Sequence, residues 1–141
     1  MKKIKCFLLA CLMMISLFIY PASAAMPETV DPLWNNTNDV VLAHDAIGTT
    51  AHCYVDISID EGATMMNVSI RLVENGTANI VKQWEDPEMA VLAFNTYSFY
   101  DTAENIVPGN TYRLIFQCEV WKNGICDYIS LGCTATYAAT E

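Results

Sequence analysis

The side chains best suited to catalysis or metal binding are two histidines, His44 and His52, and a set of cysteines. Neither histidine stands in an H-E-x-x-H motif, and the chain has no glycine-rich phosphate loop and no G-x-S-x-G nucleophile motif. His52 precedes Cys53, but neighbouring residues of a strand point to opposite faces, so these side chains should not meet. Residues 56–61 begin like a calcium loop, yet Glu61 stands where glycine is required. We therefore expect no catalytic residue, no metal site and no cofactor, and a protein that is not an enzyme.

The first 24 residues have the three parts of a bacterial export signal. Three lysines within residues 2–5 form a basic start, an apolar run covers residues 6–20, and small residues up to Ala24 fit an A-x-A cleavage site. The apolar run is shorter than the ~20 residues that span a bilayer. We predict cleavage of a signal peptide, residues 1–24, and a secreted, extracellular protein that is not held in the membrane.

The charge of the chain narrows the choice of partners. All sixteen acidic residues follow residue 24, whereas only four of the seven basic residues do. Such a surplus of negative charge repels phosphate backbones and anionic membranes, so nucleic acid is not an expected partner. Residues 25–38 are polar and without a period, which predicts an N-terminal arm, and residues 39–141 suit one domain with one core.

From residue 39 onward, apolar and polar residues alternate with the period of a β-strand. The clearest case is the segment 52–60. In the segment 66–72, Met66 is expected to share the inward face with Val68, Ile70 and Leu72. Asn75-Gly76 predicts a turn, and because a two-residue loop would set Leu72 opposite polar Asn79, we expect a longer loop or a bulge. Further strands are predicted at 40–46, 77–84 and 91–100.

The last hairpin has the strongest signal. Residues 112–121 alternate between apolar and polar, and Asn123-Gly124 is typical of a type I′ turn. Such a turn pairs Cys118 with Ile129, so that apolar residues face apolar residues on the inner side. About seven short antiparallel strands with turns between them predict an all-β protein, an immunoglobulin- or fibronectin-III-like β-sandwich.

Residues 106–112, Ile-Val-Pro-Gly-Asn-Thr-Tyr, resemble the segment that enters the sixth strand of fibronectin type III domains. There a Pro-Gly turn and a tyrosine three residues after the glycine form a tyrosine corner, whose hydroxyl bonds back to the nearby backbone. The resemblance assigns that role to Tyr112. Trp84 lies too far past Cys53 to be the core tryptophan of an antibody-type domain.

The order of parts in the whole exported chain also resembles small secreted proteins of unknown function from low-GC Gram-positive bacteria. The likeness is carried by residues 51–55, 68–72, Trp84, the entry at 108–113 and the hairpin at 120–124. It implies an immunoglobulin-like sandwich and no known activity.

Four cysteines follow the signal peptide, and export makes disulfides possible. Cys53 and Cys118 point inward on what would be the second and sixth strands. In an immunoglobulin-like sandwich these strands lie in opposing sheets, so a disulfide can cross the core. Cys133 also points inward, which leaves Cys53–Cys133 as the alternative pairing. Cys126 lies beside the hairpin turn and points outward, so it is the candidate free thiol, and a set of four reduced cysteines stays open.

The remaining surface feature is aromatic. Trp121 and Tyr128 project outward near the tip of the last hairpin, and Tyr54 projects outward on its own strand. Exposed aromatics at the end of a sandwich are typical of protein or sugar recognition, whereas the structural alternative is that Trp121 covers the core edge or packs under the arm. We hypothesise a non-enzymatic extracellular module that binds a protein, a glycan or a cell-wall component. The alternatives are a secreted hydrolase built on the histidines and an effector or toxin-like protein.

Overall fold

The computed structural model of the chain describes residues 34–139, which form eight β-strands and no helix. The predicted signal peptide and most of the predicted arm, residues 1–33, lie outside the described residues, as do residues 140–141. Within the described part, no helix is long and apolar enough to cross a membrane.

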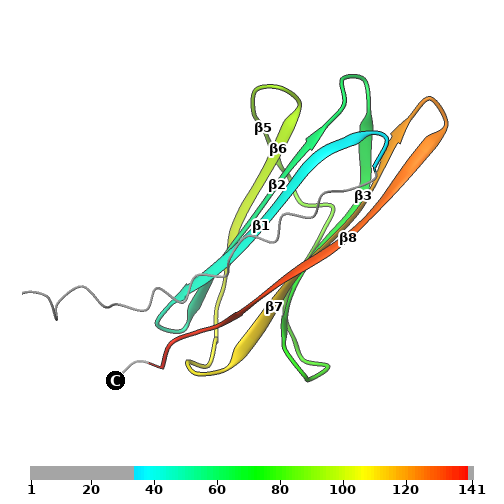
Figure 1. Ribbon diagram of the computed structural model, residues 1–141. Helices are drawn as coiled ribbons and strands as arrows, with labels where there is room; N and C mark the ends of the chain where they lie inside the picture. Colours follow the sequence, from blue (N-terminus) through cyan, green and yellow to red (C-terminus); the bar gives the residue numbers. More distant parts are fainter. Residues whose placement is uncertain (1–33, 140–141) are drawn as a thin grey trace, which may run out of the picture.

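The strands form two four-stranded antiparallel sheets that stack as a sandwich (Figure 1). One sheet has the order β1-β2-β6-β5 and the other has the order β4-β3-β7-β8. The strand bounds are β1 Thr37–Ile47, β2 Thr50–Ile59, β3 Thr64–Glu74, β4 Ile80–Glu85, β5 Ala90–Val91, β6 Thr96–Ala103, β7 Thr111–Lys122 and β8 Ile125–Thr136. The predicted all-β architecture of two stacked sheets is confirmed, with eight strands where about seven were expected.

A single apolar core lies between the sheets. The alternation predicted for the segment 52–60 places Cys53, Val55, Ile57 and Ile59 of β2 in this core. The opposing sheet contributes Val68, Ile70, Leu72, Leu114, Phe116 and Val120. Because each buried side chain of this size contributes about 1.5–3 kcal/mol, the period-two pattern is what selects two sheets with one dry face each.

The β7–β8 hairpin has the register that the sequence predicts. Lys122 pairs with Ile125 and Cys118 pairs with Ile129. The turn residues have φ angles of 52° at Asn123 and 79° at Gly124, as a type I′ turn requires. The prediction for this hairpin is confirmed residue by residue.

A β-bulge in β3 overturns one part of the predicted pattern. The β3–β7 register shifts between Met66 and Ser69, so that Asn67 and Val68 together oppose Cys118. Asn67 occupies the left-handed region with φ 55°, which asparagine tolerates better than most residues. Met66, predicted to face inward, is therefore exposed, and its neighbour Met65 packs against the core instead.

The connection between β3 and β4 contains both a longer loop and a β-bulge, the two alternatives that the sequence left open. The loop runs from Glu74 to Ile80, and the β3–β4 register shifts between Leu72 and Val73. Leu72 therefore pairs with Lys82 rather than with Asn79. The prediction of a longer loop or a bulge is confirmed, although β4 begins three residues later than the predicted start of that strand.

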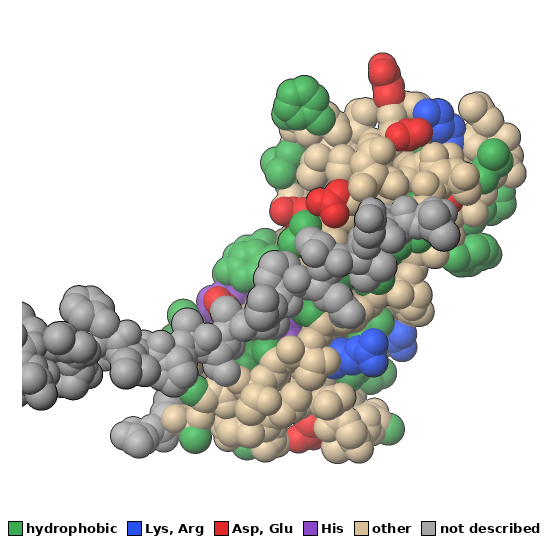
Figure 2. All heavy atoms as spheres, viewed as in Figure 1, with side chains coloured by type: hydrophobic (Ala, Val, Ile, Leu, Met, Phe, Trp, Pro, Cys, Tyr) green, Lys and Arg blue, Asp and Glu red, His purple; other side chains and the backbone are tan. Residues whose placement is uncertain are grey.

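The strand predicted over residues 91–100 is confirmed only from residue 96 onward. The structure divides this segment into the two-residue β5 and the longer β6, joined by a tight turn in which Phe94 and Asn95 have φ angles of 60° and 54°. Positive φ at a bulky aromatic residue is rare, so Phe94 did not indicate a turn at this position. Figure 2 shows hydrophobic side chains protruding at the end that carries this turn, where Val91, Leu92 and Phe94 are exposed.

Polar contacts close the sandwich along the side where β4 faces β6. Lys82 of β4 forms an ion pair with Asp101 of β6 at 3.0 Å, and the indole N–H of Trp84 donates to the same carboxylate at 2.6 Å. The Lys82 ammonium also donates to the backbone oxygen of Thr102 at 2.6 Å. Trp84 is thereby held by contacts within the fold.

The turns β2–β3, β5–β6 and β7–β8 lie together at one end of the sandwich, which we call the hairpin end (Figure 1). The described start of the chain is fastened there by Asp127. This buried carboxylate accepts the backbone N–H groups of Asn35 at 3.1 Å and Asn36 at 2.6 Å. The Asn36 side chain in turn donates to the backbone oxygen of Ile125 at 2.9 Å. The residues just before β1 thus cover the inner side of the β7–β8 hairpin.

Candidate functional site

The structure keeps the two histidines apart. His44 on β1 points inward and is buried, whereas His52 on β2 points outward, where its ring stacks with Tyr100 and its Nδ1 atom lies 2.9 Å from the Tyr100 hydroxyl. In the described part of the chain, no group of three or more histidine, cysteine or acidic side chains is arranged to hold a metal ion.

His44 is held in the core by two hydrogen bonds. Its Nδ1 atom bonds with the hydroxyl of Tyr137, and its Nε2 atom lies 3.2 Å from the backbone oxygen of Cys133, the natural acceptor of an N–H at that position. Burial lowers the pKa of His44 below its ordinary value, although the bond to Cys133 opposes the shift. His44 therefore joins β1 to β8 in its neutral form and acts as a structural residue.

Because His44 is neutral in the fold, stability is expected to fall on acidification. The unfolded chain protonates this histidine below pH ~6.5 while the folded chain does not, so the unfolded state binds more protons. The free energy of unfolding should have its full value above that pH. Below it, the free energy of unfolding should decline by at most about 1.4 kcal/mol per pH unit. Urea unfolding of wild type and His44→Gln between pH 7.5 and 5 would measure this. Equal slopes in the two proteins would contradict the assignment.

The candidate Cys53–Cys118 disulfide is not formed in the structure, where both cysteines are free. Cys53 pairs with His44, whose ring reaches Cys133, and Cys133 pairs with Leu114. This chain of contacts places Cys53 nearer to Cys133 and Leu114 than to Cys118, which lies four residues farther along β7. The alternative Cys53–Cys133 bridge is not formed either. Cys53 and Cys118 are free thiols whose pKa burial raises to about 12.

Tyr112 makes the contact that the fibronectin type III resemblance implies. Its ring is buried and stacks with Tyr137 at 5.0 Å between ring centroids. Its hydroxyl accepts a hydrogen bond from the backbone N–H of Val107 at 2.9 Å, five residues earlier in the chain. This bond fixes the entry of the chain into β7 and has no part in a surface site.

The three aromatic residues predicted to form a binding surface lie on two different faces. Trp121 on β7 and Tyr128 on β8 project from the outer face of the second sheet and are 37% and 74% exposed. Tyr54 on β2 projects from the outer face of the other sheet, where the centroid of its ring lies 4.8 Å from that of Tyr100. The three residues therefore do not form one binding surface, and only Trp121 and Tyr128 can contact the same ligand.

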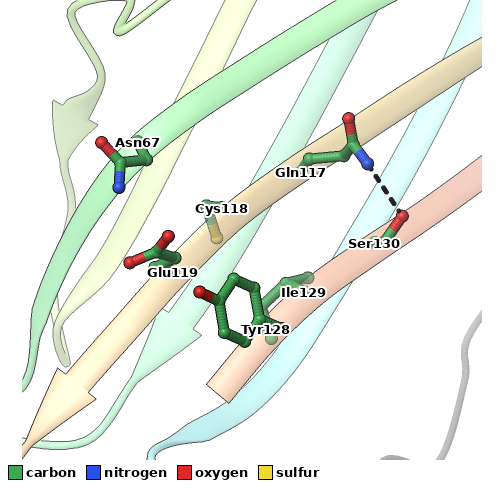
Figure 3. Close-up of a pocket in the computed structure, with 7 residues that line it drawn as sticks. All are labelled: Asn67, Gln117, Cys118, Glu119, Tyr128, Ile129 and Ser130. Carbon is green, nitrogen blue, oxygen red and sulfur yellow. Dashed lines mark hydrogen bonds between the residues drawn. The ribbon is translucent and has the colours of Figure 1, made fainter. Parts of the chain in front are cut away.

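A shallow pocket of about 220 Å³ lies on the outer face of β3, β7 and β8, beside the hairpin end (Figure 3). Seven residues line it, of which Cys118 and Ile129 belong to the core and the other five have outward side chains: Asn67, Gln117, Cys118, Glu119, Tyr128, Ile129 and Ser130. Figure 3 shows the Tyr128 hydroxyl pointing toward Glu119 across the hairpin, with Asn67 on the same side from β3. The Gln117 amide donates to the Ser130 hydroxyl at 3.2 Å. We call this feature the Glu119 pocket.

The carboxylate of Glu119 joins the pocket to Trp121. The Trp121 indole N–H donates to Glu119 Oε2 at 2.8 Å. Hydrogen bonding by Trp121, then by Asn67 and Tyr128, lowers the pKa of Glu119, and the Glu119 charge in turn raises the pKa of Tyr128. At neutral pH the pocket therefore holds a full negative charge between two exposed aromatic rings.

The sequence contained part of this site. The predicted hairpin register already places Glu119 opposite Tyr128 on the outer face, so Glu119 could have been identified from the register alone. Asn67 could not, because it reaches the pocket only through the β3 bulge. Gln117 and Ser130 are outward residues of a regular hairpin, and nothing in their pattern distinguishes them from other polar surface residues.

Comparison with protein-family models, with curated proteins and with solved structures finds no match to this chain.

Proposed function

We propose that this protein is a secreted, non-enzymatic binding module and that the Glu119 pocket with Trp121 is its ligand site. The observation that carries the proposal is an open pocket lined by Tyr128 and Glu119, whose carboxylate also accepts a hydrogen bond from the exposed Trp121 beside it. Aromatic rings beside amide and hydroxyl groups suit the recognition of sugars, in which an apolar ring face is edged by hydroxyls. Among a protein, a glycan and a cell-wall component, a glycan of the cell wall is the ligand that this lining favours.

We further propose that the sandwich belongs to the immunoglobulin and fibronectin type III class. The order β1-β2-β6-β5 follows the strands A-B-E-D of that class, and β3-β7-β8 follows C-F-G, with β4 added beside β3. The Tyr112 hydroxyl bond supports the same assignment. In this class the B–C and F–G loops, here β2–β3 and β7–β8, lie at the end most used for recognition.

The proposal of an extracellular location rests on residues 1–24, whose basic, apolar and small-residue parts follow the pattern of an export signal. The surface is in keeping with it. Figure 2 shows acidic side chains spread over the visible face with few basic ones among them. Such a surface stays soluble and does not favour nucleic acid as a partner.

Sedimentation with insoluble cell-wall glycan tests this function. The exported chain is expected to pellet with the glycan, and Trp121→Ala or Tyr128→Ala should weaken binding about 30-fold or more, as for central aromatic contacts elsewhere. Tyr54→Ala is the matched control, because it removes an exposed tyrosine from the opposite face. An equal loss in the Tyr54 variant, or unchanged binding in the other two, would refute the site.

A further inference from the structure

We infer that the Glu119 pocket takes a saccharide that carries a free amino group, a glucosamine-type unit with its ammonium next to Glu119. This inference rests on the proposed function and specifies the ligand of the same site.

The charge of the pocket is the first argument. Glu119 lines the pocket and has no ion pair within the described residues, where the two ion pairs are Lys82–Asp101 and Lys122–Asp60. Its neighbours Tyr128 and Trp121 present aromatic rings, which attract a cation through their electron-rich faces. A carboxylate and two rings without a cation of their own form a site complementary to an ammonium group.

The other end of the pocket sets the orientation of the ligand. Gln117 there accepts a hydrogen bond from the guanidinium of Arg71 at 2.6 Å, so a positive charge already stands beside that end. A second cation would be repelled at Gln117 and attracted at Glu119, two residues away on the same face of β7. The charged group of the ligand should therefore lie beside Glu119, and its uncharged groups beside Gln117 and Ser130.

The remaining lining favours a sugar over a lysine side chain. Asn67, Gln117 and Ser130 offer amide and hydroxyl groups to a ligand in the pocket. The methylene stem of a lysine would cover them without hydrogen bonds, whereas the hydroxyls of a pyranose can pair with them. Tyr128 is 74% exposed, which leaves a ring face for the apolar side of the sugar.

Calorimetric titration with two matched oligosaccharides tests the inference. The glucosamine tetramer and the N-acetylglucosamine tetramer share rings and linkages and differ in the charge at nitrogen. Wild type should bind the charged tetramer at least about tenfold more tightly, in line with a cation held by a carboxylate and aromatic rings. Glu119→Gln keeps the shape of the side chain and should abolish this preference.

Two control variants separate a specific site from the general attraction of an acidic protein for a cationic sugar. Glu85→Gln removes a charge from the same outer face, where Glu85 accepts a bond from Ser69 at 3.1 Å, and it should leave the preference unchanged. Tyr128→Ala keeps every charged group and should lose binding.

Several outcomes would overturn the inference. These are equal or tighter binding of the acetylated tetramer, a preference that survives Glu119→Gln, a Glu85→Gln effect as large as that of Glu119→Gln, or tighter binding of a lysine peptide than of the amino sugar. If neither tetramer binds while wall binding still depends on Trp121, the inference fails and the binding module stands. If wall binding does not depend on Trp121, the proposed function fails as well.

Discussion

Phe116→Ala is expected to lower the free energy of unfolding by about 3–5 kcal/mol, because the substitution removes a fully buried ring and leaves a cavity. Phe116 is inaccessible to solvent on the inward face of β7, between the two sheets. Phe116 lies within one core cluster between two hydrogen-bonded sheets, so the cavity should collapse little. Urea unfolding followed by circular dichroism would measure the change.

Phe94→Ala is the matched control for this prediction. It is the same chemical change at a phenylalanine that is 92% exposed in the β5–β6 turn. Phenylalanine and alanine both carry a Cβ atom at the positive φ of this position, so the backbone strain is unchanged, and the loss of an exposed ring should change stability by about 0.5 kcal/mol or less. Similar losses in the two variants would contradict the assignment of inward and outward faces on which the sandwich depends.

Asp127→Ala is expected to lower the free energy of unfolding by about 2–3 kcal/mol. Asp127 accepts the backbone N–H groups of Asn35 and Asn36, and hydrogen bonds to a charged group contribute about 1.5–3 kcal/mol each. The loss should be smaller than their sum, because removing the carboxylate also removes the cost of burying its charge. Denaturant unfolding would measure the loss.

Asp127→Asn preserves the size of the side chain and one of its two acceptor oxygens, so its loss should be distinctly smaller. If the alanine variant is as stable as wild type, this would contradict the role of the Asp127 hydrogen bonds in holding the residues before β1 against the hairpin.

The sequence predicted the parts of the fold that depend on local signals. The β7–β8 register followed from Asn123-Gly124 and strict alternation, because a type I′ turn of two residues allows one pairing only. The inward face of β2 followed from alternation alone. Neither inference needed any knowledge of the opposing sheet.

The errors came from features that alternation does not encode. The β3 bulge adds one residue at Asn67 and reverses the side on which Met65 and Met66 lie, and two adjacent methionines give no sign of which one is inward. The Cys53–Cys118 pairing assumed that the two strands align at those residues. Alternation determines the face on which a residue lies and leaves open the level at which opposing sheets meet, so the sequence could not show whether the two cysteines face each other.

The candidate site shows the same division. Trp121, Tyr128 and Glu119 come together because they share a regular hairpin, whereas Tyr54 was grouped with them for its exposure and lies on the far sheet. The site thus depends on the β7–β8 register, which the sequence predicts, and on the β3 bulge, which it does not predict.

Nuclear magnetic resonance of the indole groups tests the central claim most directly, because the chain has three tryptophans in different settings. Trp121 donates to Glu119 at the pocket, Trp84 donates to Asp101 at the side of the sandwich, and Trp34 packs against the core. When soluble fragments of cell-wall glycan are added, the Trp121 indole N–H signal should shift and saturate while the signals of Trp84 and Trp34 stay in place. An unmoved Trp121 signal in the presence of bound glycan, or shifts confined to Trp84 or Trp34, would contradict the account.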